Sequence, residues 1–390
     1  MDDPLRSFRD EFVVPDPGLV YFDGNSLGRL PRRTVTRLAT LVGEEWGSAL
    51  VRSWPRWMDL PLEVGDRLGA AVLGAATGQV VVCDSTTVNL YKAAAAALDV
   101  RPDRRTVVIA PEEFPTDRYV LQGLARSRGL SLGSSIGDDV ALVVRSLVDY
   151  RTGELADAAG ITATAHESGA MVLWDLSHAA GSVPADLDRW GVDLAVGCGY
   201  KYLNGGPGAP AWLYVRADLQ DELRPPVWGW MGHQEPFAMG DEWEPAAGMR
   251  RWLAGTPPIA GIVAVDCGVA MLAEAGMDRV RAKGMALTSL AAGLAEAWLE
   301  PLGFSLASPA DPAKRGSHIA LRHPEAMRLS RALIEGAEVV PDYRPPDLLR
   351  IGLAPLTTTF TEVWDGFDRI RAVAAEKGWE GYDRTPGRVT

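Results

Sequence analysis

The segment after a predicted strand at 193–196 reads Gly199-Tyr200-Lys201-Tyr202-Leu203-Asn204-Gly205-Gly206-Pro207-Gly208. Glycines let the backbone approach a ligand closely. A lysine buried beside such a loop has a lowered pKa, and its free amine can form a Schiff base. Most lysines are solvated surface residues, so this segment alone leaves a catalytic and a surface interpretation of Lys201 open.

Strand-like and helix-like patterns alternate on both sides of this segment. The predicted strands lie at 80–83, 106–110, 141–145, 171–174, 193–196 and 211–215, and the predicted helices at 87–98, 117–126 and 154–167. Such alternation predicts an α/β fold with a mostly parallel sheet covered by helices. Ligands of these sheets bind at the carboxyl ends of the strands, so polar residues that follow the strands are the candidate site.

The pattern changes after residue 262. Helices are predicted at 264–274, 279–299 and 360–377, with short strands at 317–321 and 348–352. We therefore predict a large domain over residues 46–262 and a smaller α+β domain that includes residues 263–390.

Composition narrows the class of protein. The 390 residues carry a formal net charge of −12 without a basic stripe, so no nucleic-acid partner is expected. Three widely spaced cysteines, Cys83, Cys198 and Cys267, predict neither a disulfide framework nor a metal site, and they fit a reducing cytoplasm. The acidic start and the lack of an apolar run of about 18 residues predict no signal peptide and no membrane span.

Polar residues follow two further strands. Asp175 ends the strand at 171–174 and is either a helix N-cap or a carboxylate that keeps a pyridinium nitrogen protonated. Ser85, Thr86 and Thr87 join a strand to a helix start, where hydroxyls and backbone N–H groups cap the helix or bind phosphate.

Two more residues complete the set. Phe114 follows a strand and either stacks on a flat cofactor ring or packs in the core. Arg350 either grips a substrate carboxylate or makes a surface ion pair. The order of these groups along the chain resembles that of the pyridoxal 5'-phosphate (PLP) enzymes of the aspartate-aminotransferase fold, fold type I. The order is a phosphate loop, an aromatic ring, an aspartate, a lysine and an arginine. That resemblance implies a seven-stranded, mostly parallel sheet in the large domain.

Within that group the chain resembles the kynureninase family, which is similar to class V aminotransferases. The resemblance covers residues 20–360 and rests on segments 21–28 (YFDGNSLG), 114–117 (FPTD), 174–181 (WDLSHAAG), 198–208 (CGYKYLNGGPG), 229–233 (GWMGH) and 255–259 (GTPPI). It also implies that residues 1–45 pack with the smaller domain.

The resemblance implies a role for each matching residue. PLP would be held by Lys201, and the catalytic residues would be Lys201, Tyr200 and Asp175. The implied cofactor-binding residues are Thr86, Thr87, Phe114, Asp117, Ser146, Asp175, His178, Tyr200, Lys201, Trp230 and Thr256. The implied substrate-binding residues are Asn25, Ser26, Trp54, His233 and Arg350. Trp230 and Thr256 would reach the cofactor of the neighbouring subunit, which implies a homodimer with shared active sites.

The implied reaction is hydrolytic Cβ–Cγ cleavage of L-kynurenine to anthranilate and L-alanine, a step of tryptophan catabolism, with 3-hydroxykynurenine as a further substrate. The alternatives are a homologue for a modified kynurenine, a class V aminotransferase or a desulfurase, and a non-catalytic binding protein. A desulfurase needs a mobile cysteine, which neither Cys198 nor Cys267 provides. Residues 356–358 (LTT) depart from the Leu-Tyr usual in the family, which affects the aryl end of the substrate.

Overall fold

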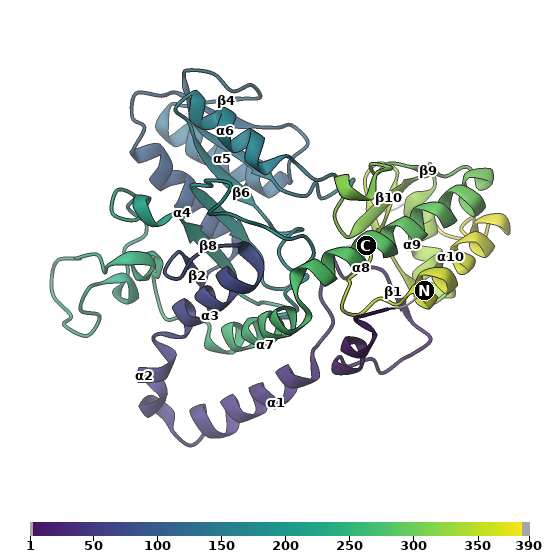
Figure 1. Ribbon diagram of the computed structural model, residues 1–390, viewed down its shortest axis with the longest axis horizontal. Coiled ribbons are helices and arrows are strands. Elements are labelled where there is room, and N and C mark those ends of the chain that lie inside the picture. Colours follow the sequence, from purple (N-terminus) through teal and green to yellow (C-terminus); the bar gives the residue numbers. More distant parts are fainter. Residues whose placement is uncertain (1–2, 384–390) are drawn as a thin grey trace.

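The structure is a computed structural model that describes residues 3–383, and its centre is a seven-stranded sheet (Figure 1). The strands are β2 (Val80–Cys83), β3 (Thr106–Ile109), β4 (Ser131–Gly133), β5 (Val140–Ser146), β6 (Met171–Asp175), β7 (Leu194–Gly197) and β8 (Ala211–Val215). Their order is β2-β8-β7-β6-β5-β3-β4, and β8 alone runs antiparallel to its neighbours. The predicted α/β fold with a mostly parallel seven-stranded sheet is confirmed. The short edge strand β4 was not among the predicted strands.

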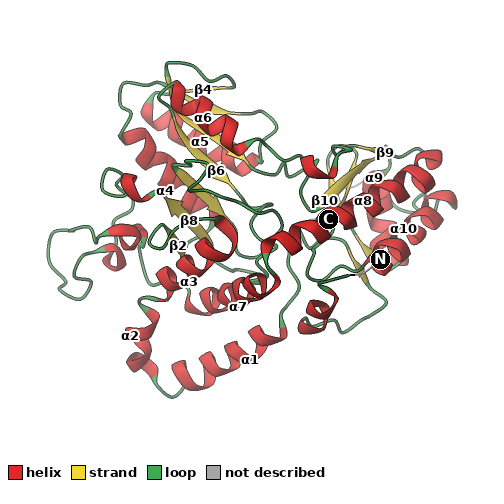
Figure 2. Ribbon diagram, viewed as in Figure 1, coloured by secondary structure: helices red, strands yellow, loops and turns green. Residues whose placement is uncertain are grey.

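Helices cover both faces of this sheet (Figure 2). Alternate residues of the strands divide into two apolar cores, with Trp174 on one side and Leu173 on the other. The core that contains Trp174 includes side chains of α3 (Leu60–Leu68), α6 (Ala158–Glu167) and α7 (Ile259–Ala275), whereas the core that contains Leu173 includes α4 (Thr86–Asp99) and α5 (Pro115–Arg128). Strands buried on both faces read as continuous apolar runs, which explains why the sequence pattern located them well.

The C-terminal part forms a four-stranded antiparallel sheet with helices on one side. Its sheet order is β12-β13-β10-β9, made of β9 (Ser305–Leu306), β10 (His318–Arg322), β12 (Asp342–Arg344) and β13 (Leu348–Gly352). The covering helices are α8 (Met277–Leu294), α9 (Ala326–Gly336) and α10 (Phe360–Ala375), whose buried side chains form a third apolar core. A Thr359–Glu362 capping box fixes the start of α10.

The N-terminal segment contacts both parts of the molecule. Strand β1 (Val20–Tyr21) pairs in parallel with β11 (Val339–Val340) beside the smaller sheet, whereas α1 (Arg32–Thr40) packs against α7. The predicted boundary at residue 262 falls inside α7, whose buried residues belong to a core of the large sheet. The two-domain division at residue 262 therefore stays a prediction.

Among residues 3–383 no single helix is long and apolar enough to cross a membrane. One pair, Ile259–Ala275 and Met277–Leu302, meets that criterion only together and is bent by 86°.

Candidate active site

Polar side chains converge on a cavity of about 290 Å³ at the carboxyl ends of β5 and β6. It is lined by Thr86, Thr87, Phe114, Thr116, Asp117, Ser146, Val148, Tyr150, Asp175, Ser177, His178, Tyr200 and Lys201. Every residue predicted to contact the cofactor lines this cavity except Trp230 and Thr256. The carboxyl ends of parallel strands meet at one edge of a sheet, which is why residues so distant in sequence gather here.

The Lys201 segment is held in a shape that requires its glycines. A side chain on Gly199 would overlap the carbonyl oxygen of Pro210, and one on Gly28 would overlap the carbonyl oxygen of Lys201. The Gly28 amide donates to the Tyr200 carbonyl at 2.8 Å, so the N-terminal segment 21–28 packs directly on the lysine segment. Gly199 therefore allows close packing against Pro210, and Gly28 allows the N-terminal segment to approach the Lys201 backbone.

Lys201 is poised to react through its amine. Its Nζ lies 2.9 Å from Nε2 of His178. Burial lowers the pKa of Lys201, and burial together with the charge of Lys201 lowers the pKa of His178 well below its ordinary value. A neutral imidazole beside a lysine with a lowered pKa favours the unprotonated amine, which is the nucleophilic form.

Two carboxyl groups, Asp117 and Asp175, share the cavity. Burial raises the pKa of Asp117 to about 9, and the nearby negative charges of Asp175 and Glu113 contribute. Burial also raises the pKa of Asp175, while Lys201 and the Ser177 amide, which donates to its Oδ1 at 2.7 Å, act in the opposite direction. The pKa values of both carboxyl groups are thus raised, and a pKa of about 9 keeps Asp117 protonated near neutral pH.

The amino end of α4 lies at the wall of the cavity and is suited to bind an anion. Ser85 is the N-cap and accepts from the Val88 amide at 3.4 Å, while Thr86 and Thr87 face the cavity. Capping and phosphate binding are thus compatible, because the cap uses Ser85 and leaves the two threonine hydroxyls for a ligand.

Phe114 lies in the cavity wall instead of the core. Its side chain is 40% exposed, and its ring meets the Tyr150 ring edge-on at a centroid distance of 5.2 Å. An aromatic ring that is open to a cavity on one face is suited to stack on a flat ligand ring.

Arg350 is buried rather than part of a surface ion pair. One terminal nitrogen contacts Asp342 and lies 2.9 Å from Ser26 Oγ, and the other donates to the Tyr150 carbonyl at 2.5 Å. Asn25 is fully buried against Gly352 on the same strand as Arg350. Arg350, Asn25 and Ser26 therefore form one cluster, and Tyr150 links it to the Lys201 cavity.

The remaining predicted residues lie outside that cavity. The Trp54 ring is 5.9 Å from the Trp230 ring, His233 lines a separate depression with Trp230, and Thr256 is exposed. Their roles in binding the cofactor and the substrate stay predictions.

Three aromatic or polar residues of this region were not predicted from the sequence. Tyr150 lines the cavity, Asp342 pairs with Arg350, and the His318 ring lies 5.5 Å from the His178 ring. Asp342 lies opposite Arg350 in the β12–β13 register. A three-residue strand carries no periodic signal, so only a prediction of strand pairing could have found Asp342.

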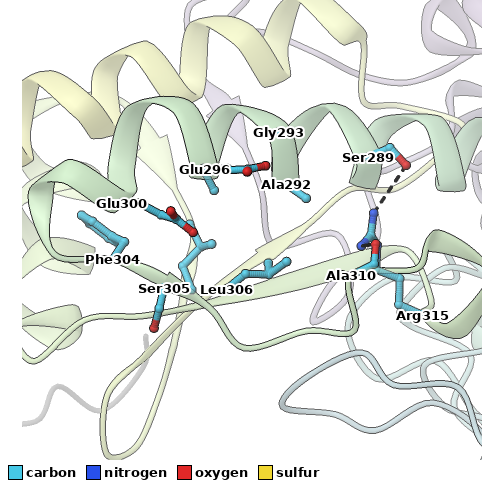
Figure 3. A pocket seen from close by; sticks show the side chains of 12 residues that line it. Ser289, Ala292, Gly293, Glu296, Glu300, Phe304, Ser305, Leu306, Ala310 and Arg315 are labelled. Carbon is cyan, nitrogen blue, oxygen red and sulfur yellow. Dashed lines mark hydrogen bonds between the residues drawn. The ribbon is translucent and has the colours of Figure 1, made fainter.

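A larger cavity of about 450 Å³ lies between α8 and β9 (Figure 3). Its lining includes Glu296, Glu300 and Arg315, and none of the predicted site residues. Arg315 Nη1 donates to two backbone carbonyls, and Nη2 lies 3.4 Å from Ser289 Oγ, the contact drawn as a dashed line. The smaller cavity is therefore preferred as the active site for its chemistry, not for its size.

The donors around Lys201 fit PLP group by group. The α4 amino end suits a phosphate, Asp175 suits a protonated ring nitrogen, Phe114 suits the ring face, and the Lys201 amine suits the aldehyde. Among the described residues, no group of three or more His, Cys, Asp or Glu could hold a metal ion.

Comparisons with solved structures agree with this fold. A cysteine desulfurase from Thermococcus onnurineus NA1 aligns with a TM-score of 0.81 at 18% identity, covering 96% of this chain and 99% of that one. The Escherichia coli cysteine desulfurase CsdA aligns with a TM-score of 0.78 at 18% identity, covering 97% of this chain and 100% of that one. At this identity the likeness shows the fold alone, and the expected fold class is confirmed.

Sequence comparisons are more specific. A family model of the kynureninase C-terminal domain matches residues 280–370, and one of class-V aminotransferases matches residues 130–321. A curated kynureninase of Pseudomonas fluorescens is 42% identical over 394 residues, covering 97% of this chain and 94% of that protein. One of Burkholderia pseudomallei (strain 1106a) is 40% identical over 395 residues, with the same coverage. The chain belongs to the kynureninase family.

Proposed function

We propose that this chain catalyses the hydrolytic Cβ–Cγ cleavage of L-kynurenine to anthranilate and L-alanine, with PLP as its cofactor. The observation that carries the proposal is the cavity in which the amine of Lys201 lies with the Asp117–Asp175 pair and the amino end of α4. Full-length similarity to curated kynureninases supports the same reaction.

The cofactor would be held at three points. Thr86 and Thr87 would bind its phosphate at the start of α4, and Phe114 would cover one face of its ring. Asp175 would pair as a carboxylate with the ring nitrogen and keep it protonated, beside Asp117, whose raised pKa favours its neutral form. Bound PLP draws electrons from the substrate Cα and makes its proton acidic.

Lys201 and Tyr200 would handle the protons. Lys201 Nζ, whose pKa is lowered by burial, would accept the Cα proton of the substrate. Burial raises the pKa of the Tyr200 hydroxyl, so this group stays protonated at neutral pH and can donate a proton. Both residues belong to one short segment of the chain, and both line the cavity.

Substrate recognition divides between two ends. Arg350, with Asn25 and Ser26 beside it, would bind the α-carboxylate. The aryl group would lie toward the side that includes Trp54 and His233. Thr357 and Thr358, which replace the usual tyrosine, are buried, and the Thr357 carbonyl accepts from Arg9 at 2.5 Å. Thr357 therefore packs against the N-terminal segment. This contact does not favour kynurenine over 3-hydroxykynurenine, so we propose both as substrates.

We propose that the active form is a homodimer with shared sites. Large apolar side chains are exposed in two segments, at Trp46, Leu50 and Val51 and at Trp228, Phe237 and Met239. Exposed apolar groups in this number are typical of an interface. The free cysteines support a cytoplasmic location, where thiols stay reduced.

Mixing two inactive variants tests the shared site. Trp230→Ala keeps its own Lys201, and Lys201→Ala keeps its own Trp230. If Trp230 serves the neighbouring cofactor, co-refolding the two variants should restore activity in the mixed dimers. If Trp230 serves its own chain, every mixed dimer lacks a complete site, and activity stays at the level of the single variants.

The cysteines do not favour a desulfurase. Cys83 and Cys198 are buried with pKa values raised by burial, and Cys267 lies on α7 with its pKa raised by burial as well. A raised pKa suppresses the nucleophilic thiolate, and none of the three cysteines lines the cavity.

Product analysis is the decisive experiment. The PLP-loaded protein is incubated in parallel with L-kynurenine and with 3-hydroxykynurenine, and alanine and the aromatic amine are quantified. We expect equal amounts of the two products, absent with Lys201→Ala. If neither L-kynurenine nor 3-hydroxykynurenine yields alanine and an aromatic amine, the proposed reaction is wrong. In a parallel incubation with cysteine, release of sulfide would favour the desulfurase alternative.

A further inference from the structure

We propose that Lys92 is a positioning residue for the cofactor phosphate. Its buried ammonium holds Asp84 and, through Asp84, the turn that brings Thr86 and Thr87 to the cavity. This inference rests on the proposed function, because it takes these two threonines as the phosphate-binding residues. Lys92 lies outside every sequence segment that resembles the family, and its contacts were found only in the structure.

The side chain of Lys92 is fully buried on α4. Lysines are almost never fully buried unless their charge is paired. Lys92 Nζ donates to Asp84 Oδ2 at 2.7 Å and to the carbonyl oxygen of Trp252. Its third neighbour, Cys83 Sγ, is at 4.0 Å. Three acceptors thus surround an ammonium that has three N–H groups, and the ion pair with Asp84 offsets the cost of burying the charge.

Asp84 forms the turn between β2 and α4. Its φ of +48° lies in the left-handed region, which is uncommon for a residue with a side chain. Its carbonyl accepts from the Ala211 amide at 2.9 Å, which ties the turn to β8. Ser85 follows as the N-cap of α4, and the two cavity threonines come directly after it. A turn in an uncommon conformation persists only when its surroundings hold it, and the ion pair with Lys92 is one such contact.

The Trp252 carbonyl anchors the other side of the ammonium. Trp252 ends the helical turn Gly248–Trp252 and is fully buried in the core that contains Leu173. Lys92 therefore links a fixed point of that core to a turn at the wall of the cavity. Thr256, for which a phosphate role is also proposed, follows Trp252 by four residues, so one ammonium contacts both chain segments with that proposed role.

Lys92 can act on the cofactor only through other residues. The cavity is lined by the two threonines, but neither Lys92 nor Asp84 lines it. Asn89, also buried on α4, adds a second tie, because its amide donates to the Cys83 carbonyl at 2.8 Å. Side chains of one helix thus hold two consecutive residues of the turn. Release of the turn would displace the threonine hydroxyls, and small displacements of binding groups have large effects.

Two cofactors that differ at the phosphate test the inference. The full-length chain, freed of cofactor, is titrated with PLP and separately with pyridoxal, which lacks the phosphate, and visible absorbance reports the binding of each. Lys92→Met keeps an unbranched side chain of similar length without the charge. It should weaken PLP binding by about 10- to 100-fold, as loss of a group that orients a ligand-binding residue does in metal sites. Pyridoxal binding should change by less than about threefold.

Asp84→Asn tests the same contact from its other side. Asparagine keeps the size of the side chain and tolerates the left-handed conformation, but its hydrogen bond with the ammonium is weaker because it carries no charge. PLP binding should weaken by about 3- to 10-fold, with pyridoxal again spared. The double variant should show the loss of Lys92→Met alone, since the contact is then already absent. Asp84→Asn decides the matter if Lys92→Met does not fold.

Two further variants are the controls. Lys283→Met removes another buried lysine, which pairs with Asp3 at 3.0 Å on α8, beside the smaller sheet. It should lower the thermal stability of the chain and leave the affinities for PLP and pyridoxal unchanged. A variant with both Thr86→Val and Thr87→Val removes the proposed phosphate contacts themselves, so it should lose affinity for PLP and keep its affinity for pyridoxal.

Unchanged PLP binding in Lys92→Met, or in Asp84→Asn when only that variant folds, would overturn the inference. Equal losses for PLP and pyridoxal, or a selective loss of PLP binding in Lys283→Met as well, would also overturn it, since a general disturbance of the fold would then explain the result. If the double threonine variant binds PLP as the parent does, the proposed phosphate site is wrong and this inference falls with it. If PLP binding depends on Lys92 but kynurenine is not cleaved, the proposed reaction fails and this inference stands.

Discussion

The two ends of the candidate site are built in different ways. At the Lys201 end, the side chains follow strands of a parallel sheet, and chain topology alone brings strand ends to one edge. At the Arg350 end, the groups lie on the face of an antiparallel sheet, and they meet through cross-strand register. The first arrangement can be predicted from residues that follow apolar runs, whereas the second depends on pairings that the sequence does not display.

The difference extends to what each end does. The Lys201 end, where we propose that the reacting groups lie, has pKa values shifted by burial and by neighbouring charges. The Arg350 end holds fixed charges and hydrogen-bond donors in a buried cluster. We therefore expect changes at the Lys201 end to alter the cofactor spectrum and kcat, and changes at the Arg350 end to alter KM.

The largest effect is expected for Lys201→Ala. It removes the amine that would hold the cofactor and accept the substrate proton, so the visible absorbance of the bound cofactor should change and kcat should fall by at least about 10³-fold. Absorbance spectra and steady-state rates measure both. Lys314→Ala, at an exposed lysine, is the matched control and should match the parent. Full activity in Lys201→Ala would exclude this cavity as the site.

A smaller loss is expected for Asp175→Asn. The amide cannot carry the negative charge that keeps the ring nitrogen protonated, so kcat should fall by about 10²- to 10³-fold while the lysine still holds the cofactor. The test compares cofactor content, spectrum and rate. Asp365→Asn, at an exposed position on α10, serves as the control. If Asp175→Asn raised KM and left kcat unchanged, Asp175 would act in substrate binding and not on the cofactor.

Arg350→Ala is expected to act on affinity. Loss of a charge-assisted contact to the substrate carboxylate should raise KM by about 10- to 100-fold and leave the cofactor spectrum unchanged. Asp342 keeps Arg344 as a partner, which limits the damage to the fold. Arg322→Ala, on the exposed end of β10, is the matched arginine control. An unchanged KM would show that Arg350 does not bind the substrate carboxylate. The proposed division of the site into a reacting end and a binding end would then be wrong.

The smallest effect is a pH-dependent stability change at Asp23. Burial and the charge of Asp342 raise the pKa of Asp23 to about 6 in the folded protein. A carboxyl whose pKa is raised by folding stabilises the protein fully below its unfolded pKa, and this contribution is lost as the pH rises through about 6. Asp23→Asn should therefore be more stable than the parent at pH 8, by about 1–3 kcal/mol, and nearly equal to it at pH 4.

Unfolding of the PLP-loaded protein by denaturant, measured at several pH values, checks this prediction. Asp365→Asn again provides the exposed comparison and should show no such trend. A stability difference that is the same at every pH would indicate lost packing rather than lost charge.

Much of the Lys201 end could be read from the sequence. The strands before Asp175 and Lys201 are buried on both faces and appear as plain apolar runs, so the residues after them could be found together. Ser146 came from the family resemblance alone. Less could be read for Trp54, Trp230 and Thr256, because their proposed contacts involve a second copy of the chain. Tyr150 was missed because it lies in a turn after β5 with no periodic signal.

By itself, the sequence determined the α/β fold, the family and much of the set of groups around Lys201. The fold follows from apolar runs that mark doubly covered strands, and Asp175 and the Thr86–Thr87 pair follow from polar residues at strand ends. The family and residues such as Asp117, Ser146 and His178 came from the resemblance of whole sequence segments. Only the tertiary structure decided that Arg350 is buried against Asp342, that Asp117 and Asp175 are buried together with raised pKa values, and that the His318 ring lies beside the His178 ring. These depend on burial and cross-strand register, and both are properties of chain segments brought together by folding.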